Sequence, residues 1–285
     1  MIPPVRDECI EQAYFFRILR ERVEANLAAQ DVMTGLAEEL LSTTRLPMAV
    51  QFVASELRHS GSMANGFDKI PHYFTPFQRF VIRQTEDDKR KLTFGTSMLL
   101  LEREAKYKAD EMTPAGLFVF QFECLTRNKL GYEDGLTAMS NEPTQSREWQ
   151  ANASMFRKQI GIVEFAELVY LRSEYYVADQ KRNDPDFVPS LLPLFGEKEG
   201  KIAKASLGRD PLFLFSALQR QLNYPEVPRP KPKDDPSILV QQLETKLRDL
   251  DIRVRMMEAE ARGNFDPTQF GKPEMFRDLP DEDPK

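Results

Sequence analysis

The chain has 285 residues, a net charge of −6 at pH 7 and 41% hydrophobic residues, and its 20 phenylalanines lie in clusters. This composition predicts either one large folded domain with extensions or two domains, and it excludes a largely disordered chain. The acidic balance argues against a broad nucleic-acid surface, which needs clustered positive charge.

The cysteines and the N-terminus indicate where the protein resides. Cys9 and Cys124 lie far apart and in no paired motif, which excludes a disulfide framework. The first eight residues have no apolar core like that of a signal peptide. The longest apolar runs, such as residues 115–120, are too short to span a membrane. We therefore expect a cytoplasmic protein without membrane association.

Helix signals dominate residues 1–222, so the fold class we expect there is an all-α, multi-helix bundle domain. Three helices should begin with a capping residue and a proline, because proline costs nothing at the first helical position. These starts are Thr75-Pro76, Thr113-Pro114 and Asp210-Pro211. Gln78 completes a capping box with Thr75, and another helix should run from Leu46 to a C-cap at Gly61.

Apolar residues recur at helical spacing between these starts. The first stripe should comprise Ile10, Tyr14, Ile18 and Leu19. In all we expect about eight helices between Asp7 and Leu222, with no strands. The connecting turns should fall near residues 61–76, 131–143 and 183–208.

Residues 223–236 carry five prolines mixed with lysine and arginine. Proline removes a backbone donor and clashes with the preceding helical turn, so no helix can continue through this segment. We expect a proline-rich, extended linker that separates the bundle domain from the C-terminal part of the chain.

Residues 237–262 show a heptad repeat, which predicts a short coiled coil. The a positions are Val240, Leu247, Val254 and Ala261, and the d positions are Leu243, Leu250 and Met257. Valine at the a positions with leucine at the d positions favours a coiled coil of two parallel helices.

Charges beside the seam favour the same parallel pairing. In a parallel dimer Lys246 faces Asp251 of the second chain and Arg253 faces Glu258, whereas antiparallel strands would place like charges together. We expect a parallel homodimer, with a parallel trimer as the near alternative. A helix folded back on its own bundle is the other alternative, because three heptads are few for a stable isolated coil.

Residues 263–285 form an acidic segment in which apolar side chains stand between carboxylates and prolines. Apolar anchors in a flexible acidic tail suit docking into a groove on a protein partner. The anchors are Phe265, Phe270 and Phe276. The alternative is a tail that packs on its own domain.

Glu56 and His59 form a Glu-x-x-His pattern on a predicted helix. Residues three apart share a helix face, and ferritin-like bundles offer a carboxylate and an imidazole to a metal in this way. Such sites need a second Glu-x-x-His, which the chain lacks. A metal pair is therefore weighed against a hydrogen-bonded pair near a helix end.

Other patterns favour structure over chemistry. The dense aromatic run at 67–80 should pack a corner between helices, with a ligand pocket as the alternative. The segment 196–201 lacks the spacing of a phosphate loop, so Lys201 and its basic neighbours should be a solvated loop, with contact to an anion or nucleic acid as the alternative. Carboxylates with basic neighbours, as in Arg103-Glu104 and Lys106, should form solvated helix faces.

These observations predict a non-enzymatic, oligomeric scaffold or adaptor that acts through protein–protein contacts and needs no cofactor. Nucleic acid is not an expected partner. The alternative is a ferritin-like metal-binding protein or enzyme that uses Glu56 and His59.

Overall fold

The structure is a computed structural model that describes residues 5–87, 92–110, 112–229, 247 and 254. The chain divides into two compact units, Met1–Pro230 and Lys231–Lys285. The described part of the first unit is helical throughout, and its only β contacts are two isolated bridges. The prediction of an all-α, multi-helix domain is confirmed, whereas the predicted coiled coil lies almost wholly outside the described residues.

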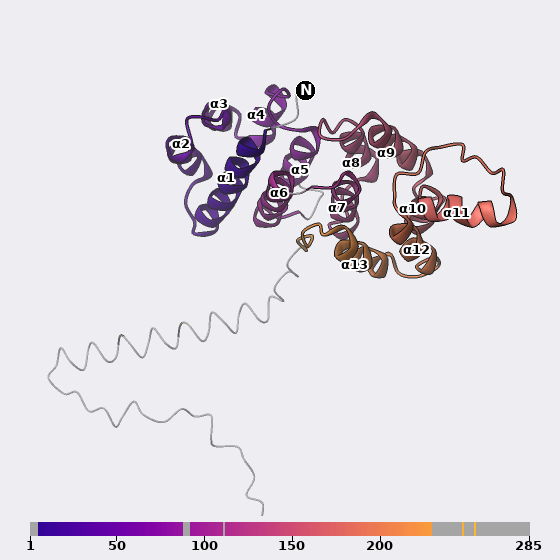
Figure 1. The fold of residues 1–285 in the computed structure, drawn as a ribbon. Helices are drawn as coiled ribbons and strands as arrows, with labels where there is room; N and C mark the ends of the chain where they lie inside the picture. Colours follow the sequence, from indigo (N-terminus) through magenta and orange to yellow (C-terminus); the bar gives the residue numbers. More distant parts are fainter. Residues whose placement is uncertain (1–4, 88–91, 111, 230–246, 248–253, 255–285) are drawn as a thin grey trace, which may run out of the picture. The chain divides into compact units, whose positions relative to one another are not determined.

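Thirteen helices make up the described part of the first unit (Figure 1). Their bounds are α1 (Arg6–Glu24), α2 (Ala29–Glu39), α3 (Leu46–Ser60), α4 (Met63–Lys69), α5 (Pro76–Glu86), α6 (Phe94–Ala109), α7 (Pro114–Arg127), α8 (Tyr132–Ser140), α9 (Arg147–Gln159), α10 (Phe165–Leu171), α11 (Glu174–Asn183), α12 (Glu197–Ala205) and α13 (Pro211–Leu222). Among the described residues, none of these helices combines the length and the apolar character that crossing a bilayer needs.

The expected number of helices, about eight, was too low because three predicted turns contain short helices. The segments near 61–76, 131–143 and 183–208 hold α4, α8 and α12, which have 7, 9 and 9 residues. Their glycines and polar residues are typical of turns, and helices this short are stabilised mainly by tertiary packing.

The predicted helix starts are confirmed, because each capping side chain accepts a backbone N–H. Thr75, Thr113 and Asp210 cap α5, α7 and α13. At Thr75 both hydrogen bonds of the capping box are present. Gly61 ends α3 with φ of 71°, a left-handed conformation that glycine adopts without steric cost.

The predicted apolar stripe of α1 is confirmed in part. Leu19 is buried and Tyr14 and Ile18 pack against the core, whereas Ile10 is exposed. α1 packs against both α2 and α6, so the buried face is wide and its centre depends on the angle between these neighbours. The spacing of apolar residues in the sequence does not reveal the angle between neighbouring helices.

Phenylalanines fill the core of the domain. Phe67 and Phe74 stack with ring centroids 3.9 Å apart, which confirms that the 67–80 run packs a corner. Farther along the chain, Phe122 stacks on Phe165 with centroids 4.0 Å apart. Offset and edge contacts of this kind add to the burial of apolar area.

The helical unit extends past α13 into the proline-rich segment. Residues 223–229, here called the C-terminal strap, include Tyr224 and Val227, which are both buried. The Asn128 side-chain amide donates to the backbone carbonyl of Pro228 at 3.2 Å, and Arg103 donates to that of Glu226. The described part of the expected linker is therefore packed on the bundle, and the rest of it lies outside the described residues.

Candidate functional site

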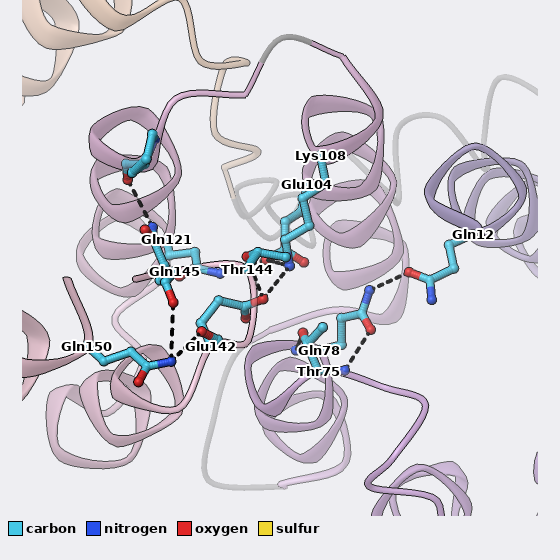
Figure 2. Close-up of polar contacts among 11 residues, drawn as sticks. Gln12, Thr75, Gln78, Glu104, Lys108, Gln121, Glu142, Thr144, Gln145 and Gln150 are labelled. Carbon is cyan, nitrogen blue, oxygen red and sulfur yellow. Dashed lines mark hydrogen bonds and ion pairs between the residues drawn. The ribbon is translucent and has the colours of Figure 1, made fainter. Parts of the chain in front are cut away.

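The densest group of buried charges joins α6 to the connection between α8 and α9. Lys108 Nζ lies 3.1 Å from Glu104 Oε1 and 3.0 Å from Glu142 Oε1 (Figure 2). The side chains of all three residues, here called the buried charge cluster, are at most 2% exposed. These residues are therefore the first candidates for a functional site.

Local structure accounts for the positions of these side chains. Glu104 and Lys108 are one turn apart on α6, where a carboxylate and an ammonium group reach each other. Gln121 on α7 donates to Glu104 Oε1 at 2.7 Å, and Thr144 donates to Glu142 Oε1 at 3.0 Å. The cluster thus ties α6 to α7 and to the segment that follows α8.

Amide side chains continue the polar contacts on both sides of the cluster (Figure 2). Gln150 donates to the backbone carbonyl of Glu142 at 2.9 Å, and Gln145 donates to that of Pro114 at 2.9 Å. In the same view, Gln78 on α5 donates to Gln12 on α1 at 2.7 Å. The first two bonds add side-chain donors to backbone carbonyl oxygens, and the third joins two buried side chains of α1 and α5.

Burial and the attraction between opposite charges shift the pKa values of two residues in the cluster. Desolvation raises the pKa of Glu104, although the adjacent ammonium group of Lys108 opposes this shift. The pKa of Lys108 is raised because its attraction to Glu104 and Glu142 outweighs its burial. Among the described residues, neither Glu104 Oε2 nor Glu142 Oε2 has a hydrogen-bond partner.

The buried charge cluster links α6 to the segment that follows α8 through ion pairs. Its carboxylates and ammonium group are closed off from solvent, so a substrate would reach them only after local opening. Cys9 lies in the same electrostatic environment, and burial raises the pKa of its thiol to about 11. A thiol in that state is a poor nucleophile at neutral pH.

The predicted metal pair lies at the end of α3. Glu56 Oε2 forms an ion pair with Lys69 Nζ at 2.6 Å, and His59 is exposed in the last turn. Within the described residues, no three His, Cys, Asp or Glu side chains are grouped so that they could hold a metal ion. The side chain of Glu56 thus contacts a lysine in this structure.

The basic residues near Lys201 lie on α12 and are engaged by neighbours. Lys201 Nζ pairs with Glu197 at 2.9 Å, and Lys204 Nζ pairs with Asp179 at 2.6 Å. Both ammonium groups also lie about 5.5 Å from the ring of Tyr175. The basic residues therefore lie on a helix, where acidic side chains pair with them. The prediction of a loop was wrong.

Only two of the predicted oligomerisation residues belong to the described residues. Leu247 and Val254 are both helical, and they are 65% and 45% exposed. The remaining predicted residues of the coil and tail lie outside the described residues: Val240, Leu243, Lys246, Leu250, Asp251, Arg253, Met257, Glu258, Phe265, Phe270 and Phe276.

Sequence reasoning missed the buried charge cluster. Arg103, Glu104 and Lys106 were expected on a solvated face, but Glu104 is fully buried while Lys106 is exposed. Successive helical residues point about 100° apart, so neighbours in sequence lie on different faces. The one available signal was the spacing of four residues between Glu104 and Lys108, which is equally common on exposed helices.

Comparisons with known proteins complete the description of the site. No protein-family model, no curated protein and no solved structure matches the chain.

Proposed function

We propose that the chain is a non-enzymatic, oligomeric scaffold or adaptor whose C-terminal helix pairs in parallel with that of a second copy. The observation that carries the proposal is the heptad register from Val240 to Ala261 together with its flanking charges. Attraction between Lys246 and Asp251, and between Arg253 and Glu258, arises only in the parallel arrangement.

Two structural observations support this proposal. Leu247 and Val254 are helical and exposed, so two apolar a-position side chains one heptad apart are available to a second chain. The buried charge cluster, which is the strongest charged constellation among the described residues, has the geometry of a fastener. The acidic tail with Phe265, Phe270 and Phe276 would then present apolar anchors to a partner protein.

Charge reversal tests the pairing. Changing Lys246 and Arg253 to glutamate should weaken the dimer, and adding Asp251→Lys and Glu258→Lys should restore it. Arg248→Glu and Arg255→Glu provide the matched control, because the b positions of the heptad face solvent. Sedimentation equilibrium measures all of these chains. A wild-type chain that is monomeric at micromolar concentration would refute the proposal.

Deletion of residues 263–285 tests the docking role separately. The shortened chain should dimerise like the full chain but should capture fewer proteins from a cell extract. If the two chains capture the same proteins, the tail does not dock partners, whatever the outcome for the coil.

A further inference from the structure

Arg172, which follows α10, is buried without a counter-charge. It is 7% exposed, and its one side-chain hydrogen bond runs from Nε to Asn152 Oδ1 at 3.0 Å. Its Nη1 has no partner, and neither has Asn152 Nδ2. In the part of the chain that the structure describes, no carboxylate lies within 4 Å of this guanidinium group. Burial lowers the pKa of Arg172, and no nearby acid opposes that shift.

An unpaired buried cation is costly, and the domain avoids it elsewhere. Removing a charge from water costs several kcal/mol unless an opposite charge or several hydrogen bonds replace the water. Lys108 has two carboxylates and Arg127 pairs with Glu123. Arg172 therefore lacks what the other buried cations have, which is an anion.

Arg172 also lines a cavity of about 310 Å³, whose other lining residues belong to α9, α10, α11 and the loop that follows α11. That volume is at the lower end of the range for small-molecule sites. Arg172 is the one charged residue in its lining, which otherwise comprises Met155, Gln159, Leu168, Leu171, Tyr176, Phe187, Val188, Pro189, Ser190 and Leu191. The site thus offers apolar walls, the polar groups of Gln159, Tyr176 and Ser190, and a single cation.

Backbone contacts hold the arginine and the loop together. The carbonyl oxygen of Arg172 accepts the N–H groups of Leu194 at 2.8 Å and Phe195 at 3.0 Å. The carbonyl oxygen of Phe195 accepts the N–H of Glu174 at 2.9 Å. The chain is therefore fastened beside Arg172 at residues 194–195, shortly after the segment 187–191 that lines the cavity.

We propose that this cavity binds a small monocarboxylate with an apolar body, whose carboxylate pairs with the Arg172 guanidinium. Guanidinium donors match carboxylate oxygens in geometry and charge, and the apolar lining would cover the rest of the ligand. This site is independent of the coiled coil and of the acidic tail, so its success or failure leaves the proposed scaffold function untouched.

Isothermal titration calorimetry with octanoate as the probe tests the proposal on the full chain. Octanoate should bind saturably, while octan-1-ol, which lacks the charge, should bind at least about 30-fold more weakly. The fluorescence of the single tryptophan, Trp149, gives a second readout, because its ring contacts Phe195 with centroids 5.2 Å apart.

Arg172→Met should weaken octanoate binding about 30-fold. An arginine with a purely structural role would instead leave octanoate binding to the folded variant unchanged. Arg182→Met is the matched control, because Arg182 is exposed on α11 and does not line the cavity.

A second pair of variants keeps the test decisive if Arg172→Met fails to fold. Leu191 lines the cavity and is 52% exposed, whereas Leu192 does not line it and is 71% exposed. Leu191→Asp should repel the carboxylate, and Leu192→Asp should bind like wild type. Absence of saturable octanoate binding to wild type would overturn the proposal, as would equal binding by Leu191→Asp and Leu192→Asp.

Discussion

The hydroxyl of Tyr224 donates to Glu123 Oε2 at 2.6 Å, joining two buried residues that are 101 positions apart in the chain. Because Glu123 is buried on α7, loss of this donor leaves a carboxylate oxygen without its partner. Tyr224→Phe should therefore lower the free energy of unfolding by about 1–3 kcal/mol. Urea unfolding followed by circular dichroism measures this change. Tyr132→Phe, which loses a hydroxyl in a more exposed place, should change stability by much less.

The C-terminal strap should contribute to stability as a whole. A chain that ends at Leu222 loses the buried side chains of Tyr224 and Val227, whereas a chain that ends at Arg229 keeps them. We expect the shorter chain to be less stable by roughly 2–5 kcal/mol, from lost apolar burial and lost hydrogen bonds. Parallel urea titrations of the two chains decide this. Equal midpoints would mean that the strap only rests on the bundle.

Lys108→Met should be among the most destabilising single changes in the domain. It leaves Glu104 and Glu142 close together and buried without their cation, and breaking a buried ion pair costs about 3–5 kcal/mol. Lys106→Met is the matched control on the same helix, because Lys106 is exposed and its partner Glu102 also contacts Arg20. A loss below about 1 kcal/mol for Lys108→Met would contradict the cluster's role as a fastener.

Glu104→Gln tests the raised pKa of Glu104. If Glu104 is neutral in the fold, glutamine replaces it with a change of no more than about 1.5 kcal/mol at pH 7. The raised pKa of Glu104 gives wild type a stability that is fully present below the ordinary value of 4.5. Wild type should lose this stability as pH rises through the raised pKa, whereas the variant should not. Urea midpoints measured across pH reveal the difference, and parallel pH profiles would show that Glu104 is ionised.

Thr75→Ala should lower the free energy of unfolding by about 0.5–2 kcal/mol, because it removes the side-chain oxygen that caps α5. Thr75→Ser keeps that oxygen and should recover most of the loss. Thermal unfolding of the two variants provides the comparison. If serine destabilises as much as alanine, the packing of the buried threonine methyl group is the cause.

The thiols should resist alkylation until the chain unfolds. Burial raises the pKa of Cys9 to about 11 and raises that of Cys124, so both stay protonated near pH 8. Iodoacetamide should label neither cysteine in the native chain and both in guanidinium chloride. Cys9 adds stability below about pH 9, its ordinary pKa, and this contribution should fade as pH rises from 9 to 11. Cys9→Ser should not show that decline.

Features set by nearby residues could be predicted from the sequence. The capping box needs only Thr75 and Gln78, and the C-cap needs only Gly61, so local chemistry decides both. The all-α class follows from many such signals taken together. The heptad register is equally local, and it remains a prediction because most of its residues lie outside those that the structure describes.

Features set by packing could not be predicted in this way. Glu104 meets Glu142 across 38 residues because α7 and α8 bring the chain back to α6, and no spacing in the sequence encodes that return. Arg172 resembles any arginine near the end of a short helix until its neighbours are known. Burial of a charged residue depends on which helices cover it, which is a property of the tertiary fold.

The C-terminal strap determines how a mechanical load would enter the helical domain. A pull from the C-terminal side reaches the contacts at Pro228, Val227 and Glu226 first, then Tyr224, and only afterwards the last turn of α13. Contacts that bear the load one after another also break one after another. The strap would therefore yield gradually and shield the helices behind it from sudden force.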